Sequence, residues 1–169
     1  MSDRNTILTT RYFVTCIHDS TAGSQIIQKN TRNLSYSFLS YGEYKAYTMN
    51  STGEIETKHL NTPKTLYDMR KWRNTGGMGM ALQDSKVINF NSLSYRYDWS
   101  GRLLSNSETT IQSNSALGFL VCFEGSCTVN ESEMAGLSYA RMEKGKEYNI
   151  SIDPDCYIGI FEGISANAS

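Results

Sequence analysis

Histidine is the side chain that most often supplies acid-base chemistry, and this 169-residue chain has only two, His18 and His59. A Ser or Cys nucleophile usually needs a base such as imidazole beside it. A borderline or soft metal held by neutral imidazoles likewise needs several of them. Because no histidine follows residue 59, we expect no hydrolase of that kind, no metal site and no other cofactor.

Carboxylates are an open alternative, because two of them with different environments can act as acid and base. The second half of the chain has several glutamates that sequence alone neither pairs nor separates: Glu108, Glu124, Glu131 and Glu133. Nothing in their spacing favours a pair.

The four cysteines are Cys16, Cys122, Cys127 and Cys156. They lie mostly in apolar runs, without C-x-x-C spacing and without a histidine close by in the C-terminal part. Such thiols usually pack as small, reduced hydrophobes. A disulfide between Cys122 and Cys127 is not expected, because the start of the chain has no export signal.

Three aromatic residues alternate along one predicted strand and make the best ligand candidates. Tyr95, Tyr97 and Trp99 share a face opposite Arg96 and Asp98. Rings at this spacing are most often part of a core. The alternative is one wall of a ligand cavity.

The opposing wall of such a cavity would come from one face of the strand around residues 118–124. Either Phe119, Val121 and Phe123 or Leu120, Cys122 and Glu124 would supply it. The second set would place a carboxylate near the mouth of the pocket. The candidate ligand-binding residues are therefore Tyr95, Tyr97, Trp99, Cys122 and Glu124.

A local basic excess runs from Lys58 to Arg73, where five Lys or Arg residues face one acidic residue, Asp68. A solvated face is the simpler interpretation. A contact with an anionic ligand or nucleic acid is the alternative.

Strands and tight turns must position these residues. The segment 116–163 reads as a buried strand through Glu124-Gly125, an alternating strand at 147–152, a turn at Asp153-Pro154-Asp155 and another apolar strand. Upstream, we expect a strand near the edge at 12–17, two strands over 34–49, an edge strand at 53–60, two strands over 86–99 and a weakly apolar one within 105–115. One short helix is predicted over 62–73, because Thr62-Pro63 looks like a helix N-terminus and apolar residues follow at helical spacing.

The order of these motifs resembles the cupin superfamily, whose members share an apolar strand ending in a Glu-Gly turn, a Gly-containing turn and a later Pro-containing turn. Those places are held here by Phe123-Glu124-Gly125, Lys144-Gly145-Lys146 and Asp153-Pro154-Asp155. The resemblance covers the C-terminal part only and is nearest to the sensory domains of AraC-type regulators. It implies a mainly β fold, an antiparallel jelly-roll barrel with one short helix.

The chain departs from the cupin pattern where metal-binding members carry histidines. Cys156 holds the place of the last metal-binding histidine, and the stretch from Gly101 to Ser115 offers Glu108 but no histidine. The resemblance therefore implies a metal-independent member. In a metal-free cupin-like enzyme, Tyr97 with Asp98 or Glu124 would be the residues to suspect.

The length and net charge of the chain limit the number of domains and the classes of partner. We expect a single domain over 1–169, in which strands and a helix of 1–80 pack on a cupin-like barrel of 81–165. The net charge of −1 gives no overall attraction to nucleic acid or to an anionic membrane. No apolar run is long enough to span a bilayer, so we expect a cytoplasmic protein without a membrane partner.

These observations favour a non-catalytic small-molecule-binding module with a sensory or regulatory role. Two alternatives stay open. One is a metal-independent enzyme, an isomerase or lyase. The other is an interaction scaffold that forms a homo-oligomer, most simply a homodimer.

Overall fold

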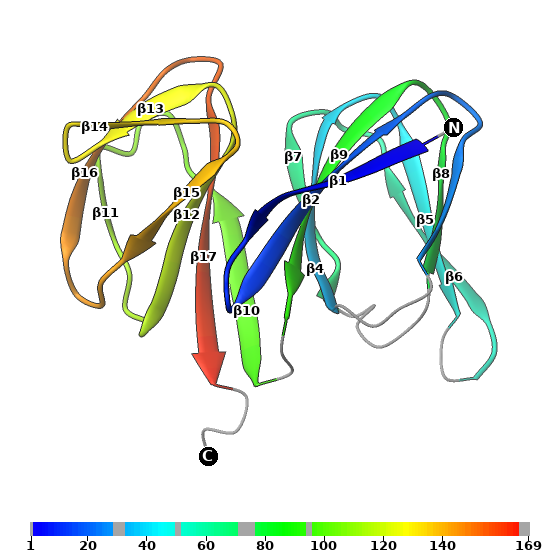
Figure 1. Cartoon of the computed structure of the whole chain (residues 1–169), viewed down its shortest axis with the longest axis horizontal. Helices are drawn as coiled ribbons and strands as arrows, with labels where there is room; N and C mark the ends of the chain where they lie inside the picture. Colours follow the sequence, from blue (N-terminus) through cyan, green and yellow to red (C-terminus); the bar gives the residue numbers. More distant parts are fainter. Residues whose placement is uncertain (1, 29–32, 50–51, 71–76, 94–95, 166–169) are drawn as a thin grey trace. The chain divides into compact units, whose positions relative to one another are not determined.

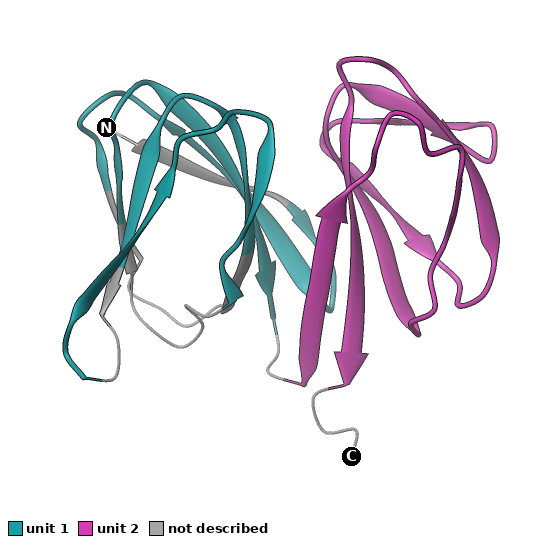
Figure 2. Cartoon of the chain, turned by 180° about the vertical axis from the view of Figure 1, so that it is seen from behind, with its two compact units in different colours: residues 1–94 teal, residues 95–169 magenta. Residues whose placement is uncertain are grey.

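Antiparallel β-strands make up nearly all of the regular structure in the computed structural model, which describes residues 2–28, 33–49, 52–70, 77–93 and 96–165 (Figure 1). The chain divides into two compact units, residues 1–94 and 95–169 (Figure 2). We call them unit 1 and unit 2. No helix in these described ranges is long and apolar enough to cross a membrane.

Unit 1 contains two sheets. The five-stranded sheet has the order β1 (Ser2–Thr9), β2 (Phe13–Ser20), β9 (Ser85–Ser92), β4 (Asn33–Tyr41) and β7 (Thr65–Asp68). The four-stranded sheet has the order β3 (Gln25–Gln28), β8 (Gly77–Ala81), β5 (Tyr44–Met49) and β6 (Ile55–Leu60). Residues 81–92, which we had grouped with the C-terminal barrel, lie in this unit.

Unit 2 also contains two sheets, each of four strands. One has the order β10 (Tyr97–Leu103), β17 (Tyr157–Ser165), β12 (Leu117–Glu124) and β15 (Ser138–Met142). The other has the order β11 (Thr110–Gln112), β16 (Glu147–Ile152), β13 (Ser126–Val129) and β14 (Ser132–Ala135). Side chains from both sheets meet in one apolar core. The mainly β, antiparallel, jelly-roll prediction is confirmed.

Local chemistry explains the turns of unit 2. Gly125 and Gly145 have φ angles of +77° and +78°, a region that costs a residue with a Cβ atom. The Pro154 turn closes through the Cys156 N–H, which donates to the Asp153 carbonyl at 2.9 Å. All three turns expected between residues 123 and 156 are therefore present.

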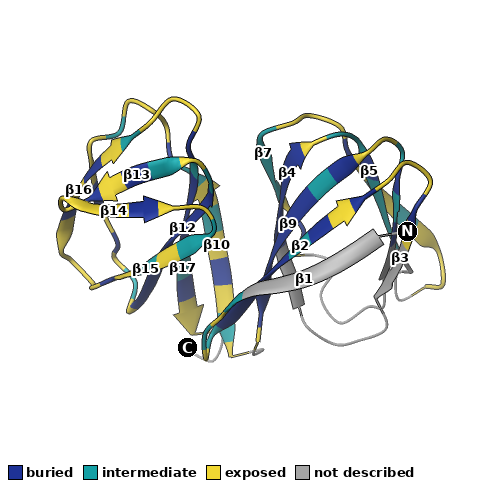
Figure 3. Cartoon of the chain, turned by 45° about the horizontal axis from the view of Figure 1, so that its top comes forward, coloured by how far each residue is buried: buried dark blue, intermediate teal, exposed yellow. Residues whose placement is uncertain are grey.

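Strand burial follows the sequence pattern. β16 alternates between buried and exposed residues, as its alternating sequence predicted. β9 and β12 are buried along almost their whole length, on both faces (Figure 3). β6 is an edge strand, as expected, and β2 lies next to the edge strand β1, between it and β9.

The helix predicted over 62–73 is also wrong for the part that the structure describes. Thr65–Asp68 is strand β7, which pairs with β4 so that Leu66 lies opposite Phe38. Thr62 caps no helix, because strand β7 follows it, and its backbone N–H donates to the Tyr67 hydroxyl at 2.9 Å. Residues 71–73 lie outside the described ranges. Pairing with β4 outweighs the helical spacing of the apolar residues.

Candidate functional site

The predicted aromatic wall lies on one face of the β10-β17-β12-β15 sheet. Trp99 is 1% exposed, and its ring centroid lies 6.0 Å from that of Phe119 and 6.4 Å from that of Tyr97. A Cβ atom at Gly163 would come within 3.1 Å of the Trp99 ring. Trp99 and Phe119 are thus neighbours on one sheet and do not form opposing walls.

Cys122 lies on the other face of that sheet. Alternation along β12 separates Phe119, Val121 and Phe123 from Leu120 and Cys122. Leu120 and Cys122 belong to the interior core of unit 2. Trp99 and Cys122 therefore cannot line the same cavity.

The remaining two candidates are Glu124 and Tyr95. Glu124 is half-buried at the end of β12, and Tyr95 lies outside the described residues. Whether any of the five candidates binds a ligand stays a prediction.

The interior of unit 1 differs, because it carries buried polar side chains. Register places Cys16 of β2, Asn89 of β9 and Ser37 of β4 in one row across the sheet, on the face that also carries the core residue Val87. Asn91 follows two residues after Asn89, on the same face. All four are at most 4% exposed. We call Cys16, Ser37, Asn89 and Asn91 the polar cluster.

Only some of the polar atoms in the cluster have hydrogen-bond partners within it. The Ser37 hydroxyl donates to Asn89 Oδ1 at 2.7 Å, and Asn91 Nδ2 lies 4.0 Å from Cys16 Sγ. Asn91 Oδ1 has no hydrogen-bond partner among the described residues. Further along the same face, the register partners Ser20 and Ser85 are buried, and their hydroxyl oxygens also have none there. Buried polar atoms are nearly always paired, so these three need an explanation.

The polar cluster contains no carboxylate, ammonium, guanidinium or imidazole group. On this face of β2 and β9, the only titratable side chains are Cys16 and His18, whereas Asp19 and Lys86 alternate onto the opposite face. Tyr44 lies nearby in the core with Val87, and burial raises its pKa to about 12. Its hydroxyl is therefore neutral and can donate or accept a hydrogen bond.

The polar cluster was missed at the level of sequence. The signal was present, since Asn89 and Asn91 alternate with Ile88 and Phe90. Polar residues in alternation usually mark the wet face of a strand. Here β9 is buried on both faces, and only the sheet order shows it.

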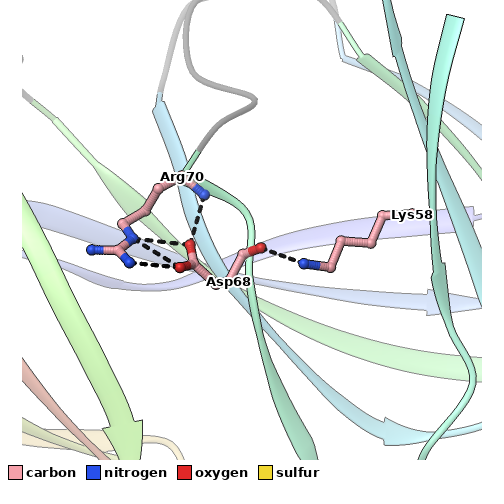
Figure 4. Close-up of polar contacts among 3 residues, drawn as sticks. All are labelled: Lys58, Asp68 and Arg70. Atoms are coloured by element: carbon pink, nitrogen blue, oxygen red, sulfur yellow. Dashed lines mark hydrogen bonds and ion pairs between the residues drawn. The ribbon is translucent and has the colours of Figure 1, made fainter.

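Two of the basic residues that the structure describes in this segment contact its acidic residue, Asp68 (Figure 4). Arg70 Nη2 lies 2.6 Å from Asp68 Oδ2, and the Lys58 ammonium donates to the Asp68 carbonyl at 2.6 Å. The hydrogen bond from the Arg70 side chain lowers the pKa of Asp68. The Arg70 guanidinium also lies 5.5 Å from the Tyr36 ring centroid. For Lys58 and Arg70, this arrangement favours a solvated, internally paired face over an anion site.

The glutamates considered for acid-base chemistry do not form an evident pair. Glu108 lies 2.9 Å from Arg102, whose hydrogen bond lowers the pKa of the carboxyl. Glu131 and Glu133 are exposed. Asp98 follows Tyr97 directly in β10, so the two side chains point to opposite faces.

The structure places no recognisable set of metal ligands among the residues that it describes. Within the described ranges, no group of three or more His, Cys, Asp or Glu side chains is placed to hold one. In unit 1 the interior face of β2 and β9 offers Cys16 and His18, and their neighbours are amides and hydroxyls. Metal independence stays a prediction.

Comparison with known proteins identifies the fold. No family model matches the chain, and no curated protein matches its sequence. Solved structures do match, among them a cupin 2 conserved barrel domain protein from Leptotrichia buccalis, with a TM-score of 0.53 at 8% identity over 98% of this chain and 89% of that one. The formate complex of oxalate decarboxylase from Lactobacillus farciminis matches with a TM-score of 0.63 at 8% identity, over 98% of this chain and 87% of that one. The protein YhaK from Escherichia coli matches with a TM-score of 0.59 at 10% identity, over 95% of this chain and 93% of that one.

The chain therefore has the cupin fold. Coverage of 98% means that the match includes both units, whereas the sequence resemblance had covered only the C-terminal part. Identities this low show the fold alone, and the likeness to AraC-type sensory domains stays a prediction.

Proposed function

We propose that this chain is a non-catalytic, cupin-fold module that binds a small, neutral, hydrogen-bonding ligand in the interior of unit 1. The observation that carries the proposal is the polar cluster. Asn91 is buried, and its Oδ1 atom has no hydrogen-bond partner among the described residues. A ligand that donates a hydrogen bond to this oxygen would remove the cost of burying it.

The side-chain types of the cluster support the ligand class. A buried charge without a partner is costly, and the interior face of β2 and β9 offers the His18 imidazole but no carboxylate, ammonium or guanidinium group to balance one. Hydroxyl and amide groups match Ser37, Asn89 and Asn91 better. Polyols, sugars and small amides are therefore the first ligands to test.

The same residues are the reason why we propose a role without catalysis. Amides and hydroxyls position a ligand well but transfer protons poorly near neutral pH. One fold neighbour is an enzyme, an oxalate decarboxylase, so catalysis remains the alternative, and the scarcity of histidine in this chain favours a metal-independent form of it. Binding without turnover suits a sensory or regulatory role, in which occupancy reports the ligand concentration.

The test is a thermal-shift screen of the whole chain against neutral polyols, sugars and amides, with small carboxylic acids as a comparison set. We expect neutral compounds to raise the melting temperature more than acids do. Asn91→Leu should abolish the shift for these hits. The variant itself should lose little stability, because it removes the unpaired Oδ1 atom and only one long contact, from Nδ2 to Cys16 Sγ at 4.0 Å.

Arg96→Ala is the matched control, since Arg96 is exposed and lies in unit 2. It should respond to hits as the unchanged protein does. Equal responses from Asn91→Leu and Arg96→Ala would contradict the proposal. Consumption of a hit during incubation would instead favour the enzyme.

A further inference from the structure

Three of the four cysteines converge in the core of unit 2. Cys122 comes from β12, Cys127 from β13, and Cys156 directly precedes β17. The Cys122 and Cys156 sulfur atoms lie 3.8 Å apart. Cys127 interacts with Cys156 both electrostatically and through a side-chain hydrogen bond, and it belongs to the same core.

Gly125 explains why the two segments approach so closely. A Cβ atom at this position would lie 2.6 Å from the Cys156 Cα atom and 2.7 Å from the Asp155 carbonyl oxygen. The Cys122 thiol lies 3.5 Å from the Glu124 carbonyl and 3.6 Å from the Gly125 carbonyl. Gly125 and Asp155 are exposed, so the thiol pair lies directly beneath two surface turns.

We propose that Cys122 and Cys156 are a reversible oxidation site, at which a low-molecular-weight disulfide such as oxidised glutathione forms an intramolecular disulfide. The thiolate of one cysteine attacks the reagent, which releases one reduced thiol and leaves a mixed disulfide. The second cysteine, as its thiolate, then displaces the remaining half of the reagent. Two protein thiols are oxidised, one reagent disulfide is reduced to two thiols, and the two protons pass to the departing thiolates.

Register and the 3.8 Å separation of the sulfur atoms favour the Cys122–Cys156 pair. In the β12-β17 pairing Cys122 lies opposite Ile158, so Cys156 is only two residues away along the neighbouring chain segment. Cys16 lies in the core of unit 1. Burial raises the pKa of Cys122 to about 11 and that of Cys156 to about 12, so oxidation should be slow at neutral pH and faster at higher pH.

The experiment incubates the folded whole chain with oxidised glutathione at two alkaline pH values, blocks the remaining thiols and maps peptides by mass spectrometry. Cleavage after Glu124 separates Cys122 from Cys127, so the linked pair can be assigned. We expect the free thiols to fall from four to two per chain, with a peptide joining Cys122 to Cys156. Dithiothreitol should restore all four.

Cys127→Ser should retain the link, and Cys156→Ser should lose it. If Cys156→Ser does not fold, the peptide map of the unchanged protein decides the question alone. A Cys127–Cys156 link, persistent glutathione adducts, or oxidation that occurs only in urea would each overturn the proposal. Because ligand binding in unit 1 uses none of these three thiols, either proposal can fail without the other.

Discussion

At the scale of single residues, the two interiors differ in chemistry. The core of unit 2 is lined by aliphatic side chains and sulfur atoms, whereas the interior of unit 1 adds buried amides and hydroxyls. A jelly-roll barrel needs an apolar core to fold, but it does not need the polar cluster for that purpose. This contrast is why we place the ligand site in unit 1.

Ser37→Ala tests whether the cluster is a connected network. Removing the hydroxyl deprives buried Asn89 Oδ1 of its donor at 2.7 Å, so we expect a loss of about 1–3 kcal/mol in the free energy of unfolding. Chemical denaturation measures it. Ser151→Ala, at an exposed position in β16, is the control and should change the value by less than about 0.5 kcal/mol. Equal values for the two variants would argue against a structural role for the bond.

The buried thiols predict that the free energy of unfolding depends on pH. Burial raises the pKa of Cys127 and of Cys156 to about 12, from an ordinary value of 9.0. Above pH 9 the unfolded chain therefore loses thiol protons that the folded protein retains. The contribution of these thiols to the free energy of unfolding is complete below pH 9 and declines as the pH rises toward about 12.

Urea denaturation under reducing conditions, near pH 8 and near pH 10, checks this expectation. Cys127→Ala should lose less stability over that interval than the unchanged protein does. An identical decline in both proteins would mean that other groups dominate the titration.

At the scale of elements, the strands with strong sequence patterns were predicted correctly, whereas the segment predicted as a helix contains strand β7 instead. Alternation identified β16, and the apolar runs identified β12 and β17, because each pattern matches the period of a strand. Leu66 and Met69 have helical spacing, but pairing with β4 decides the structure of that segment. Such pairing joins residues far apart in sequence, so a local pattern does not contain it.

The turn at Gly125 gives a sharp test at this scale. Gly125 and Gly145 have nearly the same φ, +77° and +78°, so alanine should cost about 1–2 kcal/mol at either position. Only at Gly125 would the new methyl group meet backbone, at 2.6 Å from the Cys156 Cα atom. We expect Gly125→Ala to lose a further 1–3 kcal/mol or so in denaturation experiments. Equal losses would contradict the close approach.

At the scale of the whole molecule, the cupin fold could be anticipated from three turns, but the site could not. The motifs that carried the resemblance lie in unit 2, whereas the polar cluster depends on the order β2-β9-β4 in unit 1. Residues 16, 37 and 89 have no sequence motif in common. The single-domain and homo-oligomer predictions are open to calorimetry and to mass measurement in solution.

Metal independence is also a property of the whole protein. We expect elemental analysis of untagged protein to find no stoichiometric iron, zinc, nickel or manganese, because the described side chains offer no group of three metal ligands. Histidine is confined to the first 59 residues, so unit 2 has none to contribute. One equivalent of any of these metals would require the cysteines to be reconsidered as ligands.

The most direct test of the account is a crystal structure of the whole chain with the strongest neutral compound from the screen. We predict that the compound lies inside unit 1 and donates a hydrogen bond to Asn91 Oδ1. A compound bound instead beside Trp99 and Tyr97, or an interior in which Asn91 is satisfied by protein side chains with no room beside it, would contradict the central claim.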